Sequence, residues 1–257
     1  MAPMPNGEGS PDFRTILGIR FFQGSAAAAV DRMGAGGLLV VPAAPALKDL
    51  GTDAAYREAL VHADLALADS AFMVLIWNYM EKDSVRRLSG LEYLRELLRR
   101  AEVREPGNTV WIKASKASAT RNVRWLERQG IDVPEECIYL APMYGREIDD
   151  PALLELLERI RPRHVVVTIG GGPQERLGLY LKRRLSFEPA IHCTGAAIAF
   201  LSGDQVRIPM WADRFYLGWF FRAISEPTTY IPRYWGARKL LALMRDYRGR
   251  LPMESEG

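Results

Sequence analysis

The apolar positions along this chain fall into short continuous runs that alternate with longer amphipathic stretches. Short apolar runs are typical of buried parallel strands, and a 3.6-residue apolar period is typical of helices packed on a sheet. We expect strands at Phe13–Phe22, Gly37–Val41, Ala63–Ala68, Val110–Lys113, Cys137–Leu140, Val165–Ile169 and Ala190–Cys193. We expect helices at Ser25–Met33, Thr52–His62, Ser70–Met80, Leu91–Ala101, Ala117–Gln129, Pro151–Ile160 and from Pro173 onward. This alternation with short connections predicts an α/β fold, with a mainly parallel, Rossmann-like sheet and helices on both faces.

The two ends of the chain differ in texture from its middle. Residues 1–12 are rich in Pro, Gly and Ser and are predicted to be disordered. The α/β domain is expected to span residues 13–204, and a basic, aromatic helical appendage to span 205–257. Within the domain, Ser70–Met80 is apolar almost all round, which predicts a buried helix.

A glycine turn follows the strand Val165–Ile169 and precedes a helix that starts at Pro173. Bare backbone N–H groups at such a turn can approach a phosphate at the positive end of the helix dipole. The turn and the two helix residues beside it are Gly170, Gly171, Gly172, Gln174 and Glu175. The alternative is an ordinary βα turn whose small residues serve only tight packing.

Two other strand ends carry polar residues that belong at the same edge of a parallel sheet. Ala190–Cys193 ends in Thr194 and Gly195, and Ala63–Ala68 ends in Asp69. A carboxylate at a strand end can act as a general base, or Asp69 can simply cap the following helix.

An arginine pair, Arg86 and Arg87, lies in a polar loop after the apolar helix. A guanidinium matches the geometry of a diphosphate. The alternative for this pair is two solvated surface arginines.

The C-terminal tract interleaves basic and aromatic residues. Its arginines include Arg207, Arg214 and Arg222, and its last helix places Leu240, Leu241, Met244, Tyr247 and Leu251 on one face. Basic residues with interfacial aromatics suit a membrane surface that carries anionic lipid. The alternative is an apolar stripe packed on the sheet domain, with the arginines in water.

Composition narrows the class of protein. The 257 residues are 48% hydrophobic and 25% charged, which is ordinary for a globular protein, and the net charge of +3 is too small to argue for nucleic acid. Three scattered histidines argue against a metal site, and Cys137 and Cys193 are expected as buried thiols in a reducing compartment. We find no signal peptide and no apolar run long enough to cross a membrane.

Taken in order, these pieces resemble the WecG/TagA/CpsF family of bacterial glycosyltransferases over roughly Gly37–Tyr247. The family pattern has a glycine loop ending in Gln-Glu, a Gly-Ala turn, a Pro-x-Trp segment, a Trp helix ending in Arg, a Glu-Pro step and an Arg-Tyr pair. The matching stretches are Gly170–Glu175, Thr194–Ala197, Arg207–Trp211, Leu217–Arg222, Glu226–Pro227 and Arg233–Tyr234. Upstream the match is thinner. The Thr and Asn of the family's Thr-Pro-Asn-Ala motif are Val41 and Ala43 here.

The resemblance implies an inverting transferase that moves an N-acetylmannosamine-type or related hexose from a UDP-sugar to a polyprenyl-diphosphate-linked sugar. Such enzymes assemble surface polysaccharide or cell-wall glycan, need no metal cofactor, and sit in the cytoplasm against the inner face of the cell membrane. The resemblance assigns Asp69 as the base, with Gln174 and Arg87 as further catalytic residues. It assigns substrate binding to the glycine turn, Glu175, Thr194, Gly195 and the C-terminal arginines. A homo-oligomer is left open.

Two rivals remain at the level of sequence. A catalytically impaired relative that binds a nucleotide-sugar or a partner enzyme is favoured by the apolar Val41 and Ala43 and opposed by Asp69 and Gln174. A nucleotide-dependent oxidoreductase would require a G-x-G-x-x-G turn after an early strand, and the chain has none there.

Overall fold

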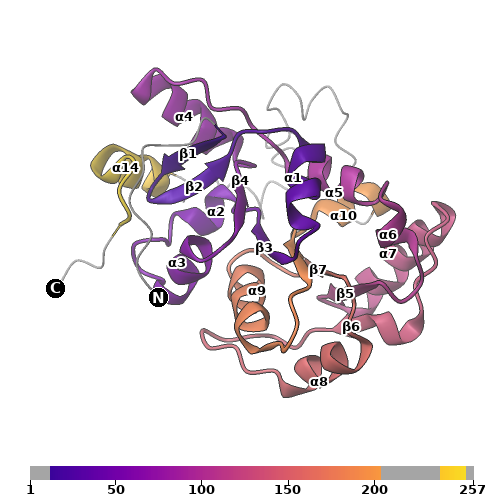
Figure 1. The fold of residues 1–257 in the computed structure, drawn as a ribbon. Coiled ribbons are helices and arrows are strands. Elements are labelled where there is room, and N and C mark those ends of the chain that lie inside the picture. The colour runs from indigo at the N-terminus through magenta and orange to yellow at the C-terminus, as the bar shows by residue number, and fades with distance from the viewer. Residues whose placement is uncertain (1–11, 204–237, 253–257) are drawn as a thin grey trace.

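The computed structural model describes residues 12–203 and 238–252. Its strands are β1 (Phe13–Ile16), β2 (Ile19–Phe22), β3 (Gly37–Val40), β4 (Leu65–Leu67), β5 (Thr109–Lys113), β6 (Ile138–Leu140), β7 (His164–Thr168) and β8 (Ala190–Cys193). They form one 8-stranded sheet in the order β1-β2-β4-β3-β8-β7-β5-β6 (Figure 1). Only the β1–β2 pair is antiparallel, so the predicted α/β fold with a mainly parallel sheet is confirmed.

Helices cover both faces of this sheet. They are α1 (Ala26–Met33), α2 (Ala44–Leu47), α3 (Ala54–Val61), α4 (Ala71–Glu81), α5 (Gly90–Leu97), α6 (Ala101–Arg104), α7 (Lys116–Arg128), the 3-10 turn η1 (Glu135–Cys137), α8 (Pro151–Ile160), α9 (Pro173–Arg184), α10 (Ala197–Ser202) and α14 (Arg238–Tyr247). His192 in β8 contacts Tyr93 of α5, whereas the next residue, Cys193, contacts Gln174 of α9. Successive strand residues point to opposite faces, so α5 and α9 lie on opposite sides of the sheet.

The N-terminal stretch differs from its prediction. The sequence predicts one strand over Phe13–Phe22, but the chain turns back at Leu17 and Gly18 to make the β1–β2 hairpin. Both turn residues have positive φ angles, 52° and 74°, which is the geometry that matches the twist of a two-residue hairpin. Leucine rarely adopts this conformation, so the residue types gave little sign of the turn.

The C-terminal end of the described chain holds that hairpin turn. The Leu17 N–H donates to the Arg248 carbonyl at 2.7 Å, and the Gly18 N–H donates to the Gly249 carbonyl at 3.1 Å. A Cβ on Gly18 would lie only 2.6 Å from the Cβ of Leu251, so only glycine fits. The segment after α14 therefore packs directly on the first hairpin.

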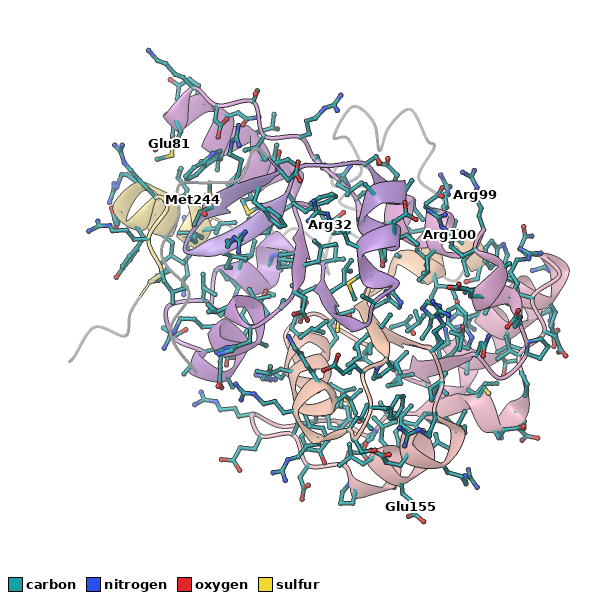
Figure 2. The ribbon with its side chains drawn as sticks, viewed as in Figure 1. Arg32, Glu81, Arg99, Arg100, Glu155 and Met244 are labelled. Carbon is teal, nitrogen blue, oxygen red and sulfur yellow. The ribbon has the colours of Figure 1, made fainter. Side chains whose placement is uncertain are left out.

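Helix α4 is less buried than its sequence predicts. Met73, Val74 and Trp77 face the core, but Phe72, Leu75 and Tyr79 are 39%, 54% and 88% exposed. The expectation of a helix buried all round is therefore wrong, and an uncharged apolar stripe faces outward. Helix α14 packs on α4, and Figure 2 shows Glu81 at the end of α4 on the same side as Met244 of α14.

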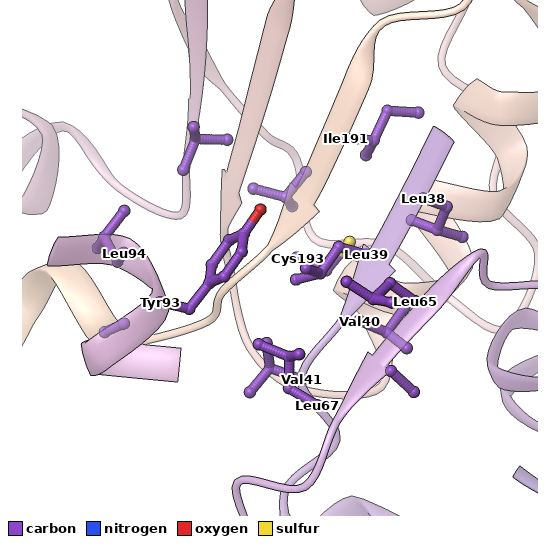
Figure 3. Close-up of a cluster of buried hydrophobic side chains, with 14 of the residues drawn as sticks. Leu38, Leu39, Val40, Val41, Leu65, Leu67, Tyr93, Leu94, Ile191 and Cys193 are labelled. Atoms are coloured by element: carbon purple, nitrogen blue, oxygen red, sulfur yellow. The ribbon is translucent and has the colours of Figure 1, made fainter. Parts of the chain in front are cut away.

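The core around the central strands is close-packed. Figure 3 shows Leu39 and Val41 from the β3 segment and Tyr93 and Leu94 from α5 within one cluster of buried hydrophobic side chains. On the other face, a Cβ on Gly178 of α9 would lie 2.5 Å from a methyl of Leu38 and 2.8 Å from the Cys193 sulfur. Cys193 and Cys137 are buried free thiols, as predicted.

A buried polar chain crosses the face covered by α5. The Tyr93 hydroxyl lies 2.8 Å from His192 Nδ1, and His192 Nε2 lies 3.1 Å from His164 Nδ1. Burial lowers the pKa of His164 to about 4 and lowers the pKa of His192 well below its usual value. Both imidazoles are therefore neutral at physiological pH.

The predicted boundary of the appendage lies outside the described residues. Within α14, Leu240 and Met244 are buried in the core, whereas Leu241 is 44% exposed. The stripe predicted from Leu240 to Leu251 thus packs on the sheet domain through part of its length. The helix also leaves Arg238, Lys239 and Arg245 exposed.

Candidate active site

Four adjacent strands bring the predicted site residues to one edge of the sheet. Strands β4, β3, β8 and β7 are neighbours and run parallel, so their carboxyl ends meet. Gly90 lies next to the residues that follow β3 and β8, because a Cβ on Gly90 would be 3.0 Å from Val41 and 3.6 Å from the Thr194 carbonyl oxygen. Gly195 then contacts Gln174, which begins the β7 side.

Asp69 is not a helix cap. Ser70 occupies the cap position of α4, and its hydroxyl accepts a hydrogen bond from the Met73 N–H at 3.1 Å. The Asp69 carboxylate instead accepts from the Gly90 N–H at 3.2 Å and pairs with Arg87 at 3.3 Å, both through Oδ1. The side chain is 30% exposed, so a carboxylate held through one oxygen faces the edge of the sheet.

The two loop arginines have different environments. Arg86 is exposed, whereas the side chain of Arg87 is only 15% exposed. Arg87 Nε also donates to the Asp69 carbonyl oxygen at 2.7 Å, so the guanidinium binds both the backbone and the side chain of Asp69. Arg87 is therefore a partner of Asp69 and not a solvated surface arginine.

The glycine turn has room beside it at each of its three residues. Among the described residues, a Cβ on Gly170 or Gly172 would meet nothing within 4 Å, and one on Gly171 would meet Ala46 alone, at 3.8 Å. Gly172 has a φ of 91°, which requires glycine. Packing against the described residues therefore does not explain the glycines at these three positions.

Glu175 folds back onto the turn that precedes it. Its carboxylate is fully buried, accepts the Gly172 N–H at 2.6 Å and accepts the Gln174 amide at 2.9 Å. Burial raises the pKa of Glu175 to about 7, against the lowering effect of these hydrogen bonds. The Gly172 N–H is thus taken up within the loop, and Gly170 and Gly171 remain to approach a ligand.

Two polar atoms of this edge lack partners. Gln174 Oε1 and Thr194 Oγ1 are buried with no hydrogen-bond partner among the described residues. Gly195, with a φ of 58°, lies against the Gln174 carboxamide, where a Cβ would be 3.4 Å from Nε2. Unsatisfied buried polar atoms are uncommon and are costly unless a ligand pairs with them.

Arg207, Arg214 and Arg222 lie outside the described residues. A hollow of about 340 Å³ beside Gly36 and Arg163 lies at the opposite, amino-terminal edge of the strands and contains none of the predicted site residues. Within residues 12–203 and 238–252, no three His, Cys, Asp or Glu side chains group as metal ligands would, and no helix is long and apolar enough to cross a membrane.

A family model described as the glycosyl transferase WecG/TagA/CpsF family matches residues 14–252. The chain belongs to this family. The predicted membership is confirmed, and with it a glycosyltransferase role. A comparison with curated proteins finds no match.

Two of the departures from the WecG/TagA/CpsF pattern, Val41 and Ala43, lie at the site. Val41 follows β3 and is 6% exposed, packed against Gly90. Ala43 is the cap residue of α2 and supplies no side-chain hydrogen bond there. Both positions are thus apolar at the edge where the family carries polar groups.

Sequence reasoning missed one contributor. Gly90 supplies a backbone N–H to Asp69, and its signal was the S-x-x-E pattern that starts α5, where Ser89 accepts from the Glu92 N–H. Glu175 was named from the sequence as a substrate-binding residue, and in the structure its carboxylate braces the turn from inside by accepting the Gly172 N–H.

Proposed function

We propose that this protein is an inverting glycosyltransferase that moves an N-acetylmannosamine-type or related hexose from a UDP-sugar to a polyprenyl-diphosphate-linked sugar. The observation that carries the proposal is the Asp69 carboxylate, held at a strand end by Arg87 and the Gly90 N–H and not used as a cap. The chemistry is a single in-line displacement. Asp69 takes the proton of the acceptor hydroxyl, whose oxygen attacks the anomeric carbon as UDP leaves.

The leaving diphosphate needs stabilisation without a metal cofactor in this proposal. The open backbone of Gly170 and Gly171 at the start of α9 supports a role in binding one phosphate, because N–H groups there lie at the positive end of the helix dipole. The basic residues Arg207, Arg214 and Arg222 are proposed to bind the diphosphate of the lipid acceptor, on their chemistry alone. Cytoplasmic surface-polysaccharide or cell-wall glycan assembly is the proposed setting.

A lipid-linked acceptor calls for a membrane surface as a partner, and we propose that α4 faces it. The exposed apolar stripe of Phe72, Leu75 and Tyr79 begins three residues after Asp69, so a bilayer on this stripe would lie beside the base. Exposed cations flank the stripe on the α4–α5 loop and on α14: Lys82, Arg86, Arg238, Lys239 and Arg245. The same cations would repel each other across a two-fold contact between copies, but they complement anionic lipid headgroups.

A catalytically impaired relative remains the second candidate. The observation that favours it is the pair of apolar residues, Val41 and Ala43, at the edge where Asp69 and Thr194 lie. Such a protein would bind a nucleotide-sugar or a partner enzyme without turnover. A transfer assay separates the two candidates directly.

The deciding experiment compares two neighbouring substitutions in transfer from UDP-N-acetylmannosamine to a polyprenyl-diphosphate-linked sugar. Asp69→Asn keeps the hydrogen bond from Gly90 and should lower turnover by roughly two to four orders of magnitude, with folding intact. Ser70→Ala removes the α4 cap and should cost about 1 kcal/mol of stability with turnover kept. Near-normal turnover in Asp69→Asn would return the residue to a structural role, and no turnover in the wild type would favour the impaired relative.

A further inference from the structure

The side-chain amide of Gln174 has a defined direction. The residue is 2% exposed, and its Nε2 donates to Glu175 Oε1 at 2.9 Å. Its oxygen, Oε1, is buried and has no hydrogen-bond partner among the described residues. A carboxamide whose NH₂ group donates to a buried protein acceptor presents its oxygen, an acceptor, on the other side.

Glu175 sets this direction. An ionised carboxylate only accepts hydrogen bonds, so a neighbouring carboxamide must turn its NH₂ group toward it. Glu175 is 0% exposed, and its second oxygen is fixed by the Gly172 N–H at 2.6 Å. The carboxylate thus cannot rotate away without breaking the glycine turn, and the Gln174 carboxamide is held beside Gly195, where a Cβ would lie 3.4 Å from Nε2 and 3.5 Å from Oε1.

We propose that Glu175 is a positioning residue that turns the Gln174 carboxamide oxygen toward the ligand, and that the ligand group bound there is a hydroxyl or N–H donor and not a phosphate oxygen. The unpartnered hydroxyl of Thr194, one residue before Gly195, adds a second polar atom to the same edge. Under the proposed function, which this inference rests on, a UDP-sugar supplies the donor group through its sugar or its nucleoside. The glycine turn then binds phosphate, and Gln174 reads a different part of the molecule.

Protonation of Glu175 reverses the arrangement. A protonated carboxyl carries an O–H that donates to the Gln174 oxygen, which turns the NH₂ group toward the ligand. The pKa of about 7 that burial gives Glu175 places this change near neutral pH. Burial raises the pKa of Tyr56 on α3 and of Cys193 on β8, so both of these neighbours stay neutral through this change, and the other group facing Glu175 is the Arg176 guanidinium, which is paired with Asp53 at 2.7 Å.

Calorimetry with UDP and with UDP-N-acetylmannosamine tests the proposal. Glu175→Gln keeps the shape but offers an NH₂ group to Gln174, so it should reverse the amide and weaken UDP-sugar binding at pH 8 by roughly tenfold or more. The wild type should lose affinity between pH 8 and pH 6, and the variant should not. If Glu175→Gln weakens the binding of the UDP-sugar but not of UDP, the hydrogen-bond donor lies on the sugar. If it weakens the binding of both equally, the donor lies on the nucleoside. Unchanged UDP-sugar affinity in the variant overturns the proposal.

A second measurement needs no ligand and separates this inference from the proposed function. The side-chain NH₂ signals of Gln174 in a ¹⁵N-labelled wild-type protein, assigned with Gln174→Ala, should shift with a midpoint near pH 7. The signals should not shift in Glu175→Gln, and those of the exposed Gln129 should not shift in either protein. If the Gln174 signals titrate but the protein binds no UDP-sugar, then the proposed function is wrong and the role of Glu175 in orienting Gln174 still holds. Absence of the titration in the wild type overturns the role of Glu175.

Discussion

The buried carboxyl of Glu175 should contribute stability that is lost as the pH rises. Its pKa is raised from 4.5 to about 7 in the folded state, because burial disfavours the anion. A group with a raised folded-state pKa contributes stability that is fully present below the unfolded pKa and is lost as the pH rises through the folded one. The loss therefore falls between about pH 4.5 and pH 7 and is complete by pH 8.

The size of the effect follows from the two pKa values. One pKa unit corresponds to about 1.4 kcal/mol, and integration from pH 5 to pH 8 gives a loss of roughly 2.5 kcal/mol. Glu175→Gln has no proton to lose at this position. The free energy of unfolding of the variant, relative to the wild type, should therefore improve by roughly 2.5 kcal/mol between pH 5 and pH 8.

Urea unfolding followed by tryptophan fluorescence at pH 5, 6.5 and 8 measures this difference. The buried imidazoles of His164 and His192 titrate in both proteins, so their contribution cancels in the comparison. Glu158→Gln is a matched control, because Glu158 accepts two hydrogen bonds from Ser186 that lower its pKa and remove it from this pH window. A wild-type-to-Glu175→Gln difference that stays constant within about 0.5 kcal/mol across the range would refute the reasoning.

Two further substitutions test the site and its surface. Gly171→Val places a branched side chain where, among the described residues, Ala46 alone lies nearby. It should weaken UDP binding, measured by calorimetry, while the fold persists, and unchanged affinity would mean that the turn serves packing alone. The second variant changes the exposed α4 side chains, Phe72, Leu75 and Tyr79, to serine. It should lose co-sedimentation with anionic liposomes, and the control that changes the exposed Leu140 and Met143 of the far sheet edge should bind as the wild type does. If both pellet equally, another surface meets the membrane.

The sequence predicted the elements that local pattern controls. Most of the predicted strands and helices agree with the structure, because apolar runs and capping residues such as Ser25, Asp53 and Asp150 act within a few neighbours. The single strand expected at Phe13–Phe22 failed because Leu17 takes a conformation that its residue type does not signal. The exposed stripe of α4 was missed because an apolar residue carries no mark of which way it faces.

The sequence predicted where the residues of the candidate site lie better than it predicted what each of them does. Asp69, Gln174 and Thr194 were placed at one edge because parallel strands end together, and the structure brings them there. Which of Asp69 and Ser70 caps α4 depended on a loop 20 residues away, since Arg87 and Gly90 engage the aspartate. Glu175 is buried where separate elements meet, close enough to Tyr56 on α3 and Cys193 on β8 for its charge to raise their pKa values, and this tertiary arrangement has no local signal in the sequence.

The bond between the hairpin turn at Leu17 and the backbone at Arg248 joins two segments that lie far apart in the sequence. The hairpin is synthesised well before its partner, so we expect this edge of the sheet to lock only after the segment at Arg248 has left the ribosome. Deletion of the C-terminal tract would strip the hairpin of this support as well as remove the basic surface. An experiment on a shortened protein could therefore not distinguish a loss of folding from a loss of lipid contact. Point substitutions in the full chain separate these two effects.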